Sequence, residues 1–295
     1  MELAEAPTGP LEPTLEEGAL LGGRFRLGQE VGGSERGCVY SARDERDEST
    51  VAVRILPPVL AADPDYLARV RRSVLVAHRV AHPNVNRVID VEQCGALAYV
   101  SMEWVPGEPL KDILARRRLT FAEARRLLLE ICAGVAAVHD QGEAHGDLRS
   151  SNVMVTEDGA QVMDFGLSCV VAEPEPSARC ALAPDSSPGV PTPAGDVYAL
   201  GVLAYRMLTG RRLARVPDAE DPMADVPAPL RDFVRGCLCP DPTQRYANAG
   251  ELVRALEQTG RRVSFVALER LDARLVGVIS TAIGFALGWA LLAAG

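Results

Sequence analysis

The sequence predicts an α+β protein of two lobes, in which a small antiparallel β-sheet carrying one helix precedes a larger helical lobe. Two pattern changes along the 295 residues support this prediction. Short β-type runs dominate as far as Val105, and helical periodicity begins after the turn at Pro106-Gly107. A third observation, an uncharged stretch near the C-terminal end, predicts an added transmembrane helix.

The first 22 or so residues are acidic and rich in proline. They show neither hydrophobic periodicity nor the basic start and apolar run of a signal peptide. A segment of this composition buries too little apolar surface to offset the entropy lost on ordering. We therefore expect a disordered tail.

The small lobe is predicted to contain five strands and one helix. The strands are expected at Phe25–Val31, Cys38–Arg43, Val51–Ile55, Val85–Val91 and Leu97–Glu103, and the helix at Asp65–Ala81. In the second lobe, helices are expected at Leu110–Leu114, Phe121–Gln141, Ala194–Thr209, Pro229–Cys237 and Ala249–Glu257. Between them, residues 172–193 hold six prolines, which predicts an irregular loop.

Charge and cysteine usage narrow the class of function. The formal charge of −9 and the pI near 5.1 argue against a general nucleic-acid binder, because no long basic stripe offsets the acids. The seven cysteines form no CxxC pair, which is typical of reduced thiols on the cytosolic side of a membrane. The arginine-rich composition is typical of a bacterial protein.

The stretch Leu275–Ala294 contains no charged residue. As a helix it would span about 30 Å, the thickness of a bilayer core. The alternative is a buried C-terminal helix, but arginines in the juxtamembrane segment 259–274 favour a single-pass anchor with the preceding domain in the cytoplasm. Ser280, Gly284 and Gly288 recur every four residues, a pattern that permits close helix packing and a homodimer, although glycine is common in such helices.

Two acids and an amide stand at a diagnostic spacing. Asp147 precedes Asn152 by five residues, and Asp164 follows in Val162-Met163-Asp164-Phe165-Gly166, where a hydrophobic run ends in a glycine turn. Phosphoryl transfer needs a positioned hydroxyl, metal ions on the phosphates and a nearby cation. The combination resembles the catalytic and metal loops of the eukaryotic-type (Hanks-type) Ser/Thr protein kinase family of bacteria.

This resemblance implies a bilobal protein-kinase-like fold over residues 23–258, with lobes at about 23–105 and 106–258, and a site for ATP and Mg²⁺. By similarity, Asp147 would be the catalytic base, and Asn152 and Asp164 would hold the metal. Arg149 and Arg54 are the other candidate catalytic residues. The ATP-binding candidates are Gly32, Gly33, Gly37, Val39, Ala52, Arg54, Glu103, Val105, Asn152 and Asp164.

Three further segments agree in order with the family. Ala183-Pro184-Asp185 resembles the end of the activation segment, and Asp196–Gly201 resembles the start of the central helix. The segment that ends in Arg245 resembles the late arginine motif, which implies a pair between Arg245 and Asp185. Agreement at this many ordered points is not expected by chance.

The sequence also departs from the family. The position of the ATP-anchoring lysine holds Arg54, and the only lysine of the chain is Lys111. Guanidinium and ammonium groups reach phosphates differently, so this exchange is not conservative. The helix glutamate aligns with Ser73, and no acid lies between Asp65 and Asp90. The ion pair of an active kinase therefore cannot form with an acid from this helix.

Smaller departures affect the loops. Ser34 replaces the second glycine of the glycine-rich loop, Gly146 replaces an arginine that reads a phosphorylated activation loop, and Ala178 replaces a threonine of the substrate platform. Loss of one preorganised donor often costs about 10² to 10³ in rate. Several such losses predict little turnover at a weakened ATP and Mg²⁺ site.

Two functions fit these residues. The first is a membrane-held pseudokinase with a scaffold or regulatory role in signalling, favoured by Arg54 and Ser73. The second is an active transmembrane Ser/Thr kinase, favoured by the complete set of Asp147, Asn152 and Asp164. A remoter third reading, phosphate transfer to small molecules, is disfavoured by the activation-segment and central-helix motifs. The sequence does not identify a protein partner or substrate.

Overall fold

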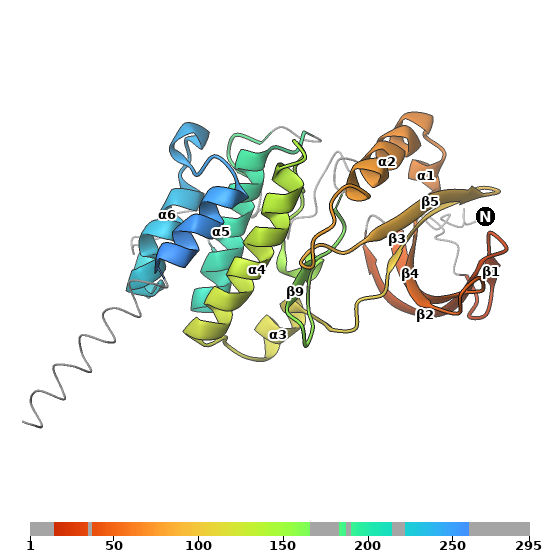
Figure 1. Cartoon of the computed structure of the whole chain (residues 1–295), viewed down its shortest axis with the longest axis horizontal. Coiled ribbons are helices and arrows are strands. Elements are labelled where there is room, and N and C mark those ends of the chain that lie inside the picture. Colours follow the sequence, from red (N-terminus) through yellow and green to blue (C-terminus); the bar gives the residue numbers. More distant parts are fainter. Residues whose placement is uncertain (1–14, 35–36, 166–182, 187–189, 214–221, 260–295) are drawn as a thin grey trace, which may run out of the picture.

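A computed structural model describes residues 15–34, 37–165, 183–186, 190–213 and 222–259 of the chain. Figure 1 shows a curled antiparallel sheet with helix α2 across it at one end of the molecule, and a group of helices at the other end. The chain crosses from one lobe to the other after strand β6. The predicted two-lobed α+β architecture is confirmed.

The small lobe is built on a six-stranded sheet with the order β1-β2-β3-β4-β6-β5, in which every neighbouring pair is antiparallel. Its strands are β1 (Leu20–Leu21), β2 (Phe25–Ser34), β3 (Gly37–Asp44), β4 (Thr50–Ile55), β5 (Val88–Cys94) and β6 (Leu97–Glu103).

Alternation along the central strands separates two apolar clusters. Ala52 of β4 lies opposite Met102 of β6, and both pack in the cluster that α2 covers. The next residue, Val53, belongs to a second cluster with Tyr99 inside the curl of the sheet. Both faces are therefore buried, which explains why these strands are almost continuously apolar.

Helices α1 (Pro58–Ala61) and α2 (Pro64–Ala77) follow β4. Asp63 caps α2 by accepting a hydrogen bond from the backbone N–H of Asp65, and Pro64 occupies the first turn, where its missing N–H costs nothing. The helix buries Tyr66, Leu67, Val70, Val74 and Ala77, and seven of its other residues are exposed to solvent. The predicted helix is confirmed, but it ends four residues before Ala81.

Several other predicted boundaries differ from the structure by a few residues, among them the start of β5 and the limit of the N-terminal tail. Strand β5 begins at Val88 rather than Val85, because Val85 instead makes an isolated parallel bridge with Val162 of the other lobe. The prediction of disorder as far as residue 22 does not hold for residues 20 and 21, since Leu20–Leu21 pairs with β2 and Leu21 is buried. The remaining acidic residues, 1–14, lie outside the described part of the chain.

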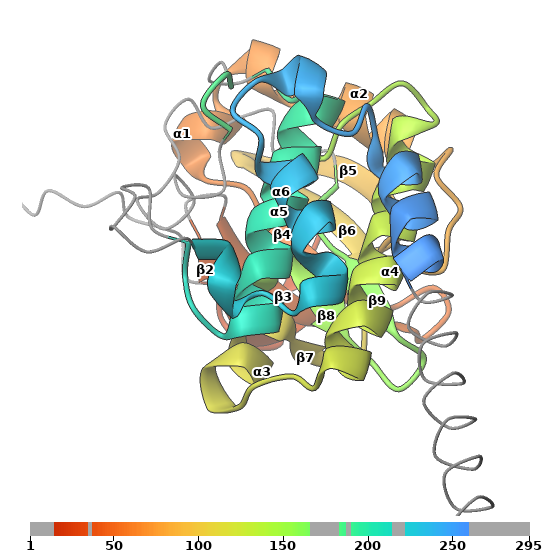
Figure 2. The same cartoon turned by 90° about the vertical axis from the view of Figure 1, so that its left-hand side faces the viewer.

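The second lobe contains α3 (Leu110–Arg116), α4 (Phe121–His139), α5 (Pro193–Thr209), α6 (Arg231–Leu238) and a helix over residues 249–259. Figure 2 looks onto α4, α5 and α6, which pack side by side. Thr120 and Glu123 form a reciprocal capping box at the start of α4, which explains why the helix begins there. Leu128, Ile131, Leu200 and Val234 are among the fully buried side chains that join these helices.

A small sheet of β7 (Glu108–Pro109), β8 (Val153–Val155) and β9 (Ala160–Val162) lies where the two lobes meet. Its strands are two or three residues long, too short for their periodicity to be seen in the sequence. Short 3₁₀ turns occur at Ser150–Asn152, Pro222–Asp225, Ala228–Leu230 and Pro242–Gln244. The sheet fixes the residues on either side of it, which carry the candidate site.

Several predictions concern residues that the structure does not describe. Among the described residues, no helix combines the length and apolar character needed to cross a bilayer. The predicted transmembrane helix Leu275–Ala294, with Ser280, Gly284 and Gly288, lies outside them. So do most of the proline-rich loop 172–193, the substrate-platform position Ala178, and Gly166.

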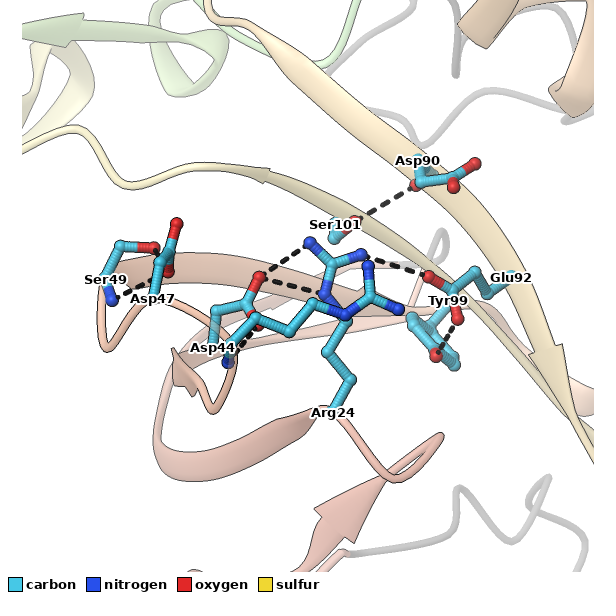
Figure 3. Close-up of polar contacts among 9 residues, drawn as sticks. Arg24, Asp44, Asp47, Ser49, Asp90, Glu92, Tyr99 and Ser101 are labelled. Carbon is cyan, nitrogen blue, oxygen red and sulfur yellow. Dashed lines mark hydrogen bonds and ion pairs between the residues drawn. The ribbon is translucent and has the colours of Figure 1, made fainter.

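A polar network joins residues near the start of β2, the end of β3 and strand β5 of the small lobe (Figure 3). Arg24 donates to the buried carboxylate of Asp44 through Nε and Nη2, at 2.9 and 2.6 Å, and its Nη1 lies 3.5 Å from Glu92. The hydroxyl of Tyr99 donates to Glu92 at 2.8 Å. Because Glu92 is on edge strand β5, these contacts hold β5 against the turn that precedes β2.

This network predicts a loss of stability in acid. The hydrogen bonds from Arg24 hold the pKa of Asp44 below its ordinary value. A carboxylate with a lowered folded pKa stabilises the fold above its unfolded pKa of about 4, and this contribution disappears as the pH falls through the folded pKa. Asp44→Asn should therefore lower the thermal midpoint at pH 7, and the gap from the unaltered chain should narrow below about pH 4.

Melting curves across that pH range provide the measurement, with Glu45→Gln as the matched control. Glu45 pairs with Arg26 on the same sheet edge, but both side chains are exposed, so this pair should contribute little. If the difference in thermal midpoint between Asp44→Asn and the unaltered chain were the same at all pH values, the stabilising role given to the Asp44 carboxylate would be contradicted.

Candidate nucleotide and phosphoryl-transfer site

The candidate site begins with the loop between α4 and β8, which carries His145, Gly146 and Asp147. Asp196, in the first turn of α5, holds this loop in place through hydrogen bonds. One carboxylate oxygen accepts hydrogen bonds from the backbone N–H of His145 at 2.6 Å and from His139 Nε2 at 2.9 Å, and the other accepts from the N–H of Gly146 at 2.8 Å. The loop conformation is thus set by a buried acid fifty residues further along the chain.

Gly146 has φ of 76°, in the left-handed region that favours glycine. Gly146 therefore allows this loop conformation. It also lacks the side chain of the arginine that, in the family, binds a phosphorylated activation loop. The N–H of this glycine reaches Asp196 because of that conformation.

His145 ties the same loop to the metal-loop segment. Its Nδ1 accepts from the N–H of Asp147 at 3.2 Å, so its Nε2 carries the proton and donates to the carbonyl of Met163 at 2.8 Å. The N–H of Met163 in turn donates to the carbonyl of Asn152. These bonds bring the segments of Asp147, Asn152 and Asp164 together, as the motif spacing predicts.

Asp147 lies between a cation and an amide. Asn152 Nδ2 donates to the carboxylate of Asp147 at 2.6 Å and to its backbone carbonyl at 2.9 Å. Arg149 Nε lies 3.2 Å from the same carboxylate oxygen, Oδ2. The candidate base therefore has a positive neighbour within its own loop.

Asp164 follows β9 and adopts φ of 61°, a left-handed conformation that costs energy for a residue with a side chain. Both of its carboxylate oxygens accept a hydrogen bond from Nη2 of Arg54, each at 2.7 Å. The two side chains are 8% and 10% exposed, so this ion pair is largely shielded from water. Arg54 thus contacts the acid that the family uses for metal.

Arg54 reaches this position from β4, where it lies opposite Val39 of β3 and Val100 of β6. Its carboxylate partner is Asp164, 110 residues away in the other lobe, rather than an acid of the helix that follows β4. Ser73, at the position of the family's glutamate, is half-buried on α2.

The predicted adenine-binding residues form one apolar surface. Ala52 and Met102 are buried in the cluster that Val39 joins from β3. The chain then leaves β6 at Glu103, whose carbonyl accepts from Asn86 Nδ2 at 3.0 Å while keeping a second lone pair. Val105 is buried two residues later. These apolar side chains are of the kind that line a site for a flat heterocycle.

The glycine-rich segment includes the end of β2 and the start of β3. Gly32 and Gly33 lie in β2, opposite Val39 and Cys38. Gly37 has φ of 100°, and a Cβ at this position would lie 1.7 Å from the carbonyl oxygen of Ile55. The fold itself therefore requires a glycine here, so the presence of Gly37 is not evidence for phosphate binding. The side chain of Ser34 lies outside the described residues.

The predicted pair of Arg245 with Asp185 is present. Arg245 is buried and donates through Nη2 to the carboxylate of Asp185, which lowers the pKa of that acid. It also donates to the carbonyls of Cys239, Pro240 and Ala194. The end of the activation segment is thus fixed to the helical lobe.

Asp164 and Asn152 offer oxygen atoms of the kind that binds Mg²⁺, but these atoms already have other partners. Carboxylate and amide oxygens are ligands that Mg²⁺ prefers. However, both oxygens of Asp164 are engaged by Arg54, and Asn152 Oδ1 accepts a hydrogen bond from Ser151 Oγ at 3.4 Å. Among the described residues, no cluster of three or more His, Cys, Asp or Glu side chains is suited to a metal ion. The metal fits poorly while Arg54 holds Asp164.

Two contributions to the site were missed at the sequence level. The first is the pairing of each acid with an arginine, Asp164 with Arg54 and Asp147 with Arg149, because linear spacing does not report which side chains meet. The second is the support of the loop by His139 and Asp196. The sequence did mark Asp196, through its place two residues after the start of a predicted helix and its resemblance to the family's central helix, but not its contacts with the loop.

Comparison with known proteins supports the fold and the family. The family model described as "Protein kinase domain" matches residues 25–256. The serine/threonine-protein kinase PknA of Mycobacterium tuberculosis is 29% identical over 274 residues, and the match covers 83% of this chain and 64% of that protein. The serine/threonine-protein kinase pkn2 of Myxococcus xanthus is 32% identical over 208 residues, covering 65% of this chain and 25% of that protein.

The crystal structure of the Mycobacterium tuberculosis PknI kinase domain resembles this fold with a TM-score of 0.70 and 23% identity for a double mutant, covering 83% of this chain and 99% of that one. This similarity concerns the fold. The chain spans less than two thirds of the length of PknA. The family model nevertheless matches most of the chain, and with the site geometry above it shows that the chain belongs to the protein kinase domain family.

Proposed function

We propose that this protein is a pseudokinase, a signalling protein that keeps the kinase fold and a weak ATP site but transfers little or no phosphate. One observation carries the proposal: both acids of the site have an arginine within hydrogen-bonding or ion-pairing distance. Arg54 holds Asp164 at 2.7 Å, and Arg149 lies 3.2 Å from Asp147. Two positive and two negative groups balance each other without a metal ion.

The charge balance has an energetic consequence. A metal ion at Asp164 would have to displace the largely buried guanidinium of Arg54, so the attraction that the metal gains at Asp164 is offset by loss of the ion pair already there. Magnesium also sheds its water ligands reluctantly. We therefore expect Mg²⁺ to add little to ATP binding, whereas ATP itself can use the apolar surface around Ala52 and Met102.

The proposed setting is the cytoplasmic face of a membrane, with residues 275–294 as a single-pass anchor. The uncharged stretch and the arginines before it support this placement. Ser280, Gly284 and Gly288 would allow two anchors to pack as a homodimer. A scaffold or regulatory role towards another protein follows from a kinase fold held at a membrane without efficient turnover.

One observation favours the alternative, an active transmembrane Ser/Thr kinase. Asp147, Asn152 and the backbone before Asp164 form a single connected network, as phosphoryl transfer requires. In that case Arg54 would move from Asp164 to the phosphates of ATP, and Asp147 would orient the acceptor hydroxyl of a protein Ser or Thr.

Phosphate transfer separates the two functions. The full chain, solubilised in detergent, would be incubated with γ-labelled ATP and Mg²⁺, alone and with a general protein substrate. We expect the unaltered chain to incorporate no more label than the Asp147→Ala variant, because arginines neutralise both acids of the site. Asp158→Ala, an exposed acid outside the site, is the matched control. Incorporation by the unaltered chain and by Asp158→Ala, abolished in Asp147→Ala, would establish the active kinase instead.

A further inference from the structure

The outward side of α2 carries a basic surface that the site does not use. Arg71, Arg72, Leu75 and Arg79 are all exposed, and the three arginines stand four and three residues before Leu75 and four residues after it. Arg71, Arg72 and Leu75 therefore lie on one side of α2, and Arg79 lies in the turn that follows the end of the helix at Ala77. We call these four residues the α2 basic face.

This surface is unusual for the molecule in charge and in polarity. Leu75 is 63% exposed in the middle of the face, one of few large apolar side chains so placed among the described residues. In the described part of the chain, no carboxylate forms an ion pair with Arg71, Arg72 or Arg79, and the nearest acids of the helix, Asp63 and Asp65, lie in or before its first turn. The chain as a whole has a charge of −9. A positive surface centred on an apolar side chain is therefore suited to an acidic segment that also contains leucine.

Such a segment exists in the same chain, before the described residues. Residues 1–14 contain Glu2, Glu5 and Glu12 together with Leu3 and Leu11, and no basic residue occurs before Arg24. The acids and leucines alternate closely enough for one short stretch to offer both kinds of contact.

The described chain begins on the face of the sheet opposite α2, where Leu15 packs against the Tyr99 cluster, and the edge strand β5 connects the two faces. Residues 15–24 lead into β2, and Arg24 lies 3.5 Å from Glu92 of edge strand β5. Strand β5 in turn packs against α2, where His78 Nε2 lies 2.7 Å from the carbonyl of Ile89. Fourteen residues can extend about 46 Å at most, at roughly 3.3 Å per residue, and this is the reach that the segment has for passing the β5 edge.

We propose that residues 1–14 dock on the α2 basic face of their own chain. Leu3 or Leu11 packs on Leu75, and the glutamates pair with Arg71, Arg72 and Arg79. Exposed ion pairs are individually weak. Tethering compensates for this weakness, because a short linker gives an effective concentration in the millimolar range. The docked segment would cover the helix that carries Ser73, and this contact is independent of whether the chain transfers phosphate.

Site-specific photocrosslinking tests the proposal in the full chain. Leu75 would be replaced by p-benzoylphenylalanine, irradiated at low salt, and digested with trypsin. Cleavage at arginine places residues 1–24 and 73–79 in separate peptides. We expect a crosslink within one chain between these peptides, mapped to residues 1–14. The probe at Val190, an equally exposed apolar position in the other lobe, is the control.

Charge variants decide the cause of the crosslink. The triple change Glu2→Lys, Glu5→Lys and Glu12→Lys should lower its yield several-fold, as should high salt. Adding Arg71→Glu, Arg72→Glu and Arg79→Glu to the triple variant should restore it. The proposal is overturned if Leu75 probes crosslink residues 1–14 no more than Val190 probes do, if the product joins two chains, or if the charge reversal has no effect on yield.

Discussion

Replacing Asp196 by asparagine is expected to lower the free energy of unfolding by about 3 kcal/mol, because a buried acceptor of several hydrogen bonds becomes partly a donor. Asp196 is 1% exposed and accepts from two backbone N–H groups and from His139. An asparagine amide would direct an N–H group at one of these donors. For a domain of this size the thermal midpoint should fall by roughly 6 to 12 °C.

The effect should extend to the candidate site. His139 Nδ1 accepts a hydrogen bond from the N–H of Ala249. Its Nε2 therefore carries the proton and donates a hydrogen bond to Asp196. Loss of Asp196 therefore disturbs the helix at 249–259 as well as the loop of His145. Denaturant unfolding at an unchanged m-value gives the measurement. Asp158→Asn is the same chemical change at an exposed position, and it should stay within about 0.5 kcal/mol of the unaltered chain. Equal effects of the two substitutions would contradict the anchoring role.

Replacing Arg54 by alanine is expected to make the protein respond to Mg²⁺. The change leaves the largely buried carboxylate of Asp164 without the guanidinium at 2.7 Å, at a cost of about 3 to 5 kcal/mol. A divalent cation can then neutralise Asp164, and binding to the folded state alone raises stability by about 2.7 kcal/mol at a hundred times the dissociation constant. Melting curves should show low stability in EDTA and recovery in millimolar Mg²⁺.

The double variant Arg54→Ala, Asp164→Asn is the matched control. It lacks both charges, so it should melt above Arg54→Ala in EDTA and should not respond to Mg²⁺. If Arg54→Ala also ignores Mg²⁺, Asp164 does not hold metal even when it is released, and the proposed competition between Arg54 and the metal is wrong.

The extent to which the sequence predicted the fold depended on the length of each element. Strand β6 has the bounds expected from its apolar run, Leu97–Glu103, and α5 begins one residue before the expected Ala194. The three-residue strands β8 and β9 have too few residues for a period to appear. Helix α2 stops at Ala77, before His82-Pro83, although its apolar pattern continues to Val80, which is buried as part of a loop.

The candidate site could be predicted in position but not in pairing. Motif order located Asp147, Asn152 and Asp164, and similarity to the family gave the pair of Arg245 with Asp185, which the structure contains. The contact of Arg54 with Asp164 joins residues 110 positions apart and replaces the pair that the family would supply. It depends on the left-handed backbone of Asp164 and on the absence of an acid between Asp65 and Asp90, and only the second of these is visible in the sequence.

The Mg²⁺ response of the unaltered chain tests the central claim most directly, since the claim is that Arg54 already occupies the carboxylate a metal would need. The measurement is the thermal midpoint of the full chain with ATP, in millimolar Mg²⁺ and in EDTA. The proposed ion pair predicts the same midpoint in both samples. A rise of several degrees in Mg²⁺ that Asp164→Asn abolishes would show that the metal displaces Arg54 readily, and would contradict the account.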